Sequence, residues 1–70
     1  MDYLHLDIDH VMKDTGKAFL VHVVDGRELW LPKKVISDPE DYKEGDMGEI
    51  TISIQQWFAD KEGIEPVEYE

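Results

Sequence analysis

The chain has 70 residues and no cysteine, and 17 acidic residues against 7 basic ones give it a net charge of −10. This length suffices for one small domain with a thin core, and the lack of cysteine excludes disulfides and thiolate metal sites and fits a reducing compartment. The acidic balance opposes binding to nucleic acid and to anionic membranes, and it favours basic protein surfaces as partners. No apolar run approaches the roughly 20 residues of a membrane-spanning helix, and the first ten residues lack the basic region of a signal peptide, so we expect a cytoplasmic protein.

The first predicted element is a strand over residues 3–9. Its apolar side chains Leu4, Leu6 and Ile8 alternate with polar ones, which is typical of a half-buried strand. Residues 13–17 are polar and include a glycine, which predicts a turn.

A β-hairpin is predicted next, because Asp25-Gly26 separates the apolar residues 18–24 from residues 27–31. We predict a two-residue turn with Gly26 at positive φ, in which His22 faces Leu29 and Val21 faces Trp30. One face then carries Leu20, His22, Val24, Leu29 and Leu31, and the other carries Phe19, Val21, Val23 and Trp30. Both faces are largely apolar and need cover, which favours a small, strongly bent sheet or barrel.

The second half of the chain predicts a loop, a strand and a short helix. Residues 37–48 are rich in acidic residues, Gly and Pro, whereas residues 49–54 alternate as a strand with its isoleucines inward. Residues 55–62 predict one or two helical turns that end at Gly63, with Trp57 and Phe58 packed onto the sheet. The predicted fold is therefore mainly β, a small antiparallel SH3-like or OB-like barrel or an open twisted sheet, with one domain over residues 1–64 and an acidic tail over residues 65–70.

Residues for catalysis or metal binding form no recognisable pattern. The candidate metal ligands are His5, Asp7, Asp9, His10 and His22. Their spacing matches no metal motif, so we predict no metal and no cofactor. Ser37, Ser53, Thr15 and Thr51 have no histidine at the spacing of a nucleophile and its base, and we predict that the protein is not an enzyme.

The acidic stretch is the first candidate binding surface. Its candidate partner-binding residues are Asp38, Glu40, Asp41, Glu44, Asp46 and Glu49. Spaced carboxylates can imitate nucleic acid phosphates and attract a basic groove. The first functional hypothesis is an acidic interaction protein that binds a basic protein, with inhibition of a nucleic-acid-binding protein by mimicry as its specific form. The alternative interpretation is a solvated loop.

Trp30 with Lys33 and Lys34 is the one basic aromatic patch. An exposed tryptophan between lysines can stack on bases and hold phosphates, so the alternative function is a DNA- or RNA-binding accessory domain. We favour a buried Trp30 packed with Phe19, Val21 and Trp57, because large aromatic residues dominate small cores. A third hypothesis is an assembly subunit that dimerises through the apolar hairpin face, which leaves monomer and homodimer both open.

Several short motifs together resemble a domain of small phage and prophage proteins. They are Lys17-Ala18-Phe19-Leu20-Val21, the run from Asp25 through Trp30-Leu31-Pro32-Lys33, Ile50-Thr51-Ile52, Trp57-Phe58-Ala59 and Gly63-Ile64. The resemblance covers residues 17–64, and the Trp-Leu-Pro-Lys run is its most specific part. Lys34 stands where these phage proteins usually have a serine, and the loop before Glu49 is longer and more acidic here than in them. The resemblance implies a phage or mobile-element context and a role near nucleic acid.

Overall fold

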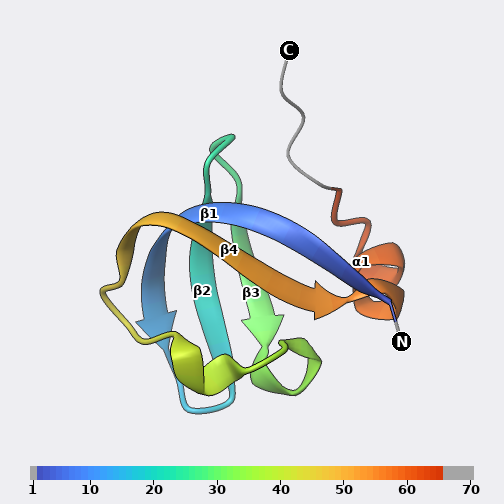
Figure 1. The fold of residues 1–70 in the computed structure, drawn as a ribbon, viewed down its shortest axis with the longest axis horizontal. Coiled ribbons are helices and arrows are strands. Elements are labelled where there is room, and N and C mark those ends of the chain that lie inside the picture. Colours follow the sequence, from blue (N-terminus) through green and yellow to red (C-terminus); the bar gives the residue numbers. More distant parts are fainter. Residues whose placement is uncertain (1, 66–70) are drawn as a thin grey trace.

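The protein folds into one open antiparallel sheet, and a short helix follows its last strand. A computed structural model describes residues 2–65; of the predicted acidic tail, residues 66–70 lie outside the described residues. The elements in chain order are β1 (Tyr3–Asp14), β2 (Ala18–Val23), β3 (Glu28–Pro32), the 3₁₀ turns η1 (Lys33–Val35) and η2 (Pro39–Asp41), β4 (Met47–Gln55) and α1 (Gln56–Glu62). The strand order is β3-β2-β1-β4 (Figure 1). The predicted mainly β fold with a short helix is confirmed, as an open sheet.

The strand β1 is long enough to serve both halves of the sheet. It pairs with β4 from Tyr3 onwards and with β2 as far as Asp14, and its pairing shifts register between Ile8 and His10 and again between Val11 and Lys13. Such bulges bend a strand and raise its twist. The bend carries β4 and the first part of β1 across the β2–β3 hairpin (Figure 1), and an isolated bridge between Ile36 and Ile54 brings the chain after β3 beside β4 without closing the sheet.

The hairpin between β2 and β3 forms as predicted, but its turn is one residue longer. Val21 pairs with Leu29 and Leu20 pairs with Trp30, so the predicted two-residue turn is wrong. The Gly26 N–H donates to the Val23 carbonyl at 2.9 Å, and the Val23 N–H donates to the Arg27 carbonyl at 2.7 Å. These bonds close a three-residue loop that ends in a glycine bulge, with Gly26 at φ 102°, the positive φ that was predicted.

The longer turn exchanges the two faces of β3, since a one-residue shift moves every side chain to the opposite face. Leu29 and Leu31 therefore join the inward side chains of β2, and Trp30 lies outside next to Leu20. The buried core that results consists of Leu6, Ile8, Val11, Phe19, Val21, Val23, Leu31, Val35, Ile36, Ile52, Ile54, Phe58 and Ala59. With these residues on one side, a single apolar layer is enough to hold the bent sheet together.

The helix α1 ends where the sequence predicts. Gly63 follows it at φ 68°, and two backbone bonds, Gly63 N–H to the Asp60 carbonyl and Ile64 N–H to the Ala59 carbonyl, complete its C-terminal cap. Phe58 is buried against the sheet, but Trp57 is 52% exposed, so the prediction that Trp57 packs onto the sheet is wrong. Among the described residues no helix has the length and apolarity to cross a bilayer.

Candidate functional site

The acidic loop comprises residues 38–46 together with the first three residues of β4, 47–49, and Tyr42 anchors it to the inner side of the sheet. The Tyr42 hydroxyl donates to the Thr51 carbonyl at 3.1 Å, and its ring meets the buried Phe19 ring edge-on, with 6.5 Å between the ring centroids. The aromatic ring thus covers the end of the core, while the polar residues around it stay in water. This anchor depends on contacts between distant parts of the chain, and no local sequence pattern indicates it.

Backbone hydrogen bonds join the other end of the loop to β1. The Gly45 N–H donates to the Val11 carbonyl, and the Val11 N–H donates to the Asp46 carbonyl, each at 2.8 Å. The Glu44 carboxylate accepts the Asp14 N–H at 3.0 Å. The loop backbone is consequently held at several points along its length.

The carboxylates of the acidic loop are left without cationic partners. Asp46 is partly buried and the five others are exposed: Asp38, Glu40, Asp41, Glu44 and Glu49. Within residues 2–65 the ion pairs are His22 with Asp9, Arg27 with Asp25, and Lys33 with Asp14, so none involves the loop.

Two of the six predicted partner-binding residues also support the loop itself. Glu44 holds the Asp14 N–H, and Asp46 accepts the Lys43 N–H at 3.0 Å. The remaining four carboxylates, called the outer acids below, accept no backbone N–H within residues 2–65, and all are exposed: Asp38, Glu40, Asp41 and Glu49. Of these, Asp38 accepts the neighbouring Ser37 hydroxyl at 3.5 Å. The structure thus separates acids that shape the loop from acids that are free to contact a partner.

The pKa of Tyr42 reports on the charge around the loop. Burial raises the pKa of the Tyr42 hydroxyl above its ordinary value, and the negative charges of Asp41 and Asp38 raise it further. The phenol therefore stays protonated and keeps its hydrogen bond to Thr51 well into the alkaline range.

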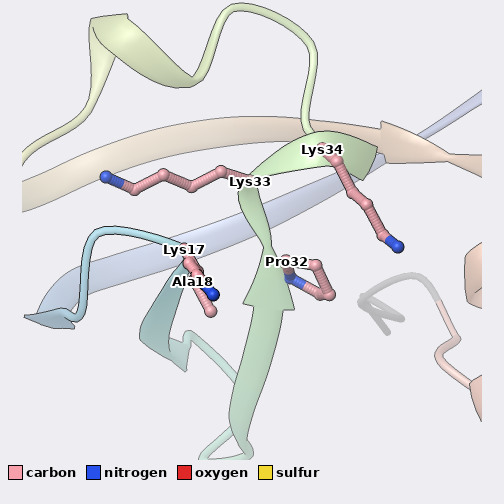
Figure 2. A pocket seen from close by; sticks show the side chains of 5 residues that line it. All are labelled: Lys17, Ala18, Pro32, Lys33 and Lys34. Atoms are coloured by element: carbon pink, nitrogen blue, oxygen red, sulfur yellow. The ribbon is translucent and has the colours of Figure 1, made fainter.

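Trp30 is 51% exposed, so the interpretation that it packs in the core is wrong. Trp30 on β3 lies opposite Leu20 on β2. The next pair on the same outer face is Pro32 with Ala18. Ala18 and Pro32 line a shallow depression of about 580 Å³ together with Lys17, Lys33 and Lys34 (Figure 2). An exposed aromatic ring next to an apolar hollow is a surface that a macromolecule can cover.

The two lysines predicted beside Trp30 point in different directions. The Lys33 ammonium lies 2.8 Å from the Asp14 carboxylate and 4.6 Å from the centroid of the Phe19 ring. Lys34 extends to the other side of the chain (Figure 2). The hydrogen bond from Lys33 and another from the Gly16 N–H lower the pKa of Asp14. Both lysines line the depression beside Trp30, but the Lys33 ammonium is paired with Asp14, which leaves Lys34 as the unpaired one of the two predicted lysines within residues 2–65.

The predicted metal ligands are distributed over separate contacts. His22 Nδ1 lies 2.7 Å from the Asp9 carboxylate, and Asp7 accepts the Thr51 hydroxyl at 3.0 Å. The described residues contain no group of three or more His, Asp or Glu side chains that could share an ion.

The sequence spacing does not indicate one serine–histidine pair, because the two residues come together only across neighbouring strands. His5 Nδ1 lies 2.8 Å from the Ser53 Oγ, and these residues are direct partners in the β1–β4 ladder. His5 is exposed and Ser53 partly so. Serine catalysis also requires an oriented histidine and donors for an oxyanion. We interpret the pair as part of a polar cross-strand ladder; pairing strands before searching for such residues would have found it.

A scan of protein-family models finds no match to this chain, and comparisons with curated proteins and with solved structures find none either. The resemblance to phage and prophage proteins therefore stays a prediction.

Proposed function

We propose that this protein is a non-enzymatic interaction protein whose acidic loop binds a basic surface of a partner protein. The observation that supports this most is the arrangement of the outer acids: four carboxylates without cationic partners in the described chain, on a backbone held by Tyr42 and β1. Charges on an ordered backbone lose little conformational freedom on binding. They also steer association with an oppositely charged surface.

A nucleic-acid-binding protein is the class of partner that suits this surface best. Its groove is built to hold a series of negative charges, and the loop offers exposed carboxylates together with a whole-chain charge of −10. In that case the protein and a nucleic acid compete for one groove, and binding inhibits the partner.

The test compares two variants with equal net charge. The loop variant carries Asp38→Asn, Glu40→Gln, Asp41→Asn and Glu49→Gln, and the matched control carries Asp2→Asn, Asp60→Asn, Glu62→Gln and Glu65→Gln. Wild type on a resin is used to select a basic nucleic-acid-binding protein, which is then purified and titrated by calorimetry against all three proteins at ~0.15 M salt. We expect the loop variant to bind at least roughly tenfold more weakly and the control to bind nearly as well as wild type.

Equal weakening by both variants would mean that only overall charge matters, and it would contradict a loop-specific site. Adding an oligonucleotide that the partner binds should displace the wild-type protein; simultaneous binding of both would contradict mimicry.

A second candidate function, nucleic acid binding, is favoured by one observation, the exposure of Trp30. Stacking on an exposed tryptophan contributes roughly 1–3 kcal/mol per base. Lys33, however, is paired with Asp14, so fewer cations are free near the ring than the sequence indicated. We expect at most weak oligonucleotide binding at physiological salt. Micromolar or tighter binding that is lost in a folded Trp30→Ala variant would favour this function over the first.

A further inference from the structure

The strand β3 is an edge of the sheet, and its outer side has no strand partner within residues 2–65. The Arg27 carbonyl accepts the Val23 N–H, and the Lys33 N–H donates to the Lys17 carbonyl, so odd-numbered residues of this segment bond to β2. Bonding directions alternate along an antiparallel strand. Glu28 and Trp30 therefore direct both N–H and C=O to the free edge, and Pro32 directs only its C=O there, since proline has no N–H.

The exposed side chains along this edge include a central tryptophan and opposite charges towards the two ends of the strand. Trp30 is the middle residue of the five in β3 and is half exposed. Glu28 is exposed at the start of the strand, and Lys34 is exposed just after its end. Figure 2 shows Lys34 extending away from β2, to the side on which a further strand would lie.

We propose that two copies of this chain pair antiparallel through their β3 edges, with the two-fold axis at Trp30. Each Trp30 then exchanges two backbone hydrogen bonds with the partner's Trp30, and each Glu28 N–H donates to the partner's Pro32 carbonyl. The two indole rings lie directly across from each other on one face, where aromatic cross-strand pairs are favourable. The sheet continues through both copies, and the missing N–H of Pro32 limits the pairing to this short stretch.

The charges along the edge favour a second copy over an unlike strand. In this register Glu28 lies opposite the partner's Pro32, and Lys34 follows Pro32 by two residues. Each Lys34 is therefore the diagonal neighbour of the partner's Glu28, within reach of a long side chain. A two-fold interface must be self-complementary in this way, and opposite charges at the two ends of one strand satisfy that condition. The net charge of −10 on each copy opposes association, so added salt should strengthen the pairing, whereas it weakens binding through the acidic loop.

This edge pairing does not depend on the proposed function, because it uses no residue of the acidic loop. The loop variant removes negative charge without touching β3, so it should dimerise as well as wild type or better even where it fails to bind a basic protein. Failure of either proposal thus leaves the other standing.

The test is a charge-exchange cycle measured by sedimentation equilibrium over a series of protein concentrations. Wild type, Glu28→Lys, Lys34→Glu and the double variant are compared at equal salt. We expect each single exchange to weaken the dimer roughly tenfold, because it places like charges together at two symmetry-related sites. The double variant restores opposite charges and the wild-type net charge, so it should dimerise as wild type does.

The two single exchanges move the net charge in opposite directions. If overall repulsion alone controlled association, Glu28→Lys would strengthen the dimer and Lys34→Glu would weaken it, and that result would overturn the proposal. A wild type that stays monomeric at high concentration and high salt would overturn it too, as would a double variant without recovery. Far-ultraviolet circular dichroism of the three variants, whose changes lie at the two exposed positions Glu28 and Lys34, establishes that the sheet is intact.

Discussion

The acidic loop and the β3 edge are both exposed, but they offer different groups to a partner. Backbone groups of Gly45 and Asp46 in the loop are already hydrogen-bonded to β1, and the Tyr42 hydroxyl is bonded to β4. The loop therefore presents mainly charged side chains to a partner. The edge presents unused backbone groups and a tryptophan. Charged side chains act over a distance and are screened by salt, whereas backbone pairing acts only on contact and depends on strand geometry. If both proposals hold, the two surfaces should respond oppositely to ionic strength.

The largest expected effect comes from Phe19, which contacts both regions. Its ring is fully buried, meets Tyr42 of the loop, and lies beneath Lys33 at the end of β3. Phe19→Ala should lower the free energy of unfolding by about 3–5 kcal/mol, since it removes a large buried ring and leaves a cavity. Denaturant unfolding measures this loss; a loss below ~1 kcal/mol would show that the two regions do not share this residue as their support.

Gly26 tests the turn that sets the face of Trp30. Its φ of 102° is unfavourable for any residue with a Cβ, although the space around it is open. Gly26→Val should therefore destabilise the protein by about 1–2 kcal/mol through backbone strain alone. Val24→Thr in the same loop is the matched control and should change the denaturation midpoint little. Equal midpoints for wild type and Gly26→Val would contradict the bulged turn.

Tyr42→Phe separates the hydroxyl of the loop anchor from its ring. Loss of the hydrogen bond to Thr51 should cost about 1 kcal/mol at neutral pH. The folded state raises the pKa of Tyr42 above the unfolded value of ~10. The stability that this shift contributes is complete below the unfolded pKa and is lost as pH rises towards the folded pKa. Wild type should thus lose stability above about pH 10, and the variant should lose less over the same range.

The end of β3 should respond at the opposite end of the pH scale. The pKa of Asp14 is lowered by Lys33 and by the Gly16 N–H, so its contribution to stability is complete above the unfolded pKa of ~3.9 and disappears as pH falls through the lower folded value. Lys33→Met removes the ion pair and should flatten the acid branch of the stability curve. An unchanged acid branch in thermal unfolding from about pH 5 to 2 would show that the pair contributes nothing to stability.

The smallest effect on stability is expected for the loop variant that lacks the outer acids. These four side chains form no ion pair with a described residue, and asparagine tolerates the positive φ of Asp38 well. Its free energy of unfolding should stay within about 0.5 kcal/mol of wild type. A large loss of unfolding free energy in chemical denaturation would mean that these acids support the loop and are not free for a partner.

The sequence predicts the elements of this fold better than it predicts their faces. Alternation in residues 3–9 and 49–54, the Asp-Gly turn and the glycine after the helix all correspond to observed features. The turn length was wrong because Asp-Gly suits both a two-residue turn and a three-residue loop with a glycine bulge. One extra residue was enough to turn Trp30 from the predicted core to the surface.

The candidate site was predictable in composition and not in geometry. The acidic residues 38–49 are visible in the sequence, but their division into loop-supporting and outer acids depends on hydrogen bonds to Asp14 and Lys43. The occupation of Lys33 likewise depends on Asp14, which the fold places beside it across the sheet end. The two contacts of Asp14, with Glu44 and with Lys33, join distant parts of the chain, so no local pattern encodes them.

The shared strand β1 has a consequence for synthesis on the ribosome. Its later part pairs with β2, which follows within a few residues, but its earlier part waits for β4, whose partner of Tyr3 is Gln55. Translation adds about 5–20 residues per second, so for several seconds Leu4 and Leu6 stay without their strand partners on the nascent chain. During that interval a chaperone or a neighbouring nascent chain would bind this protein most easily.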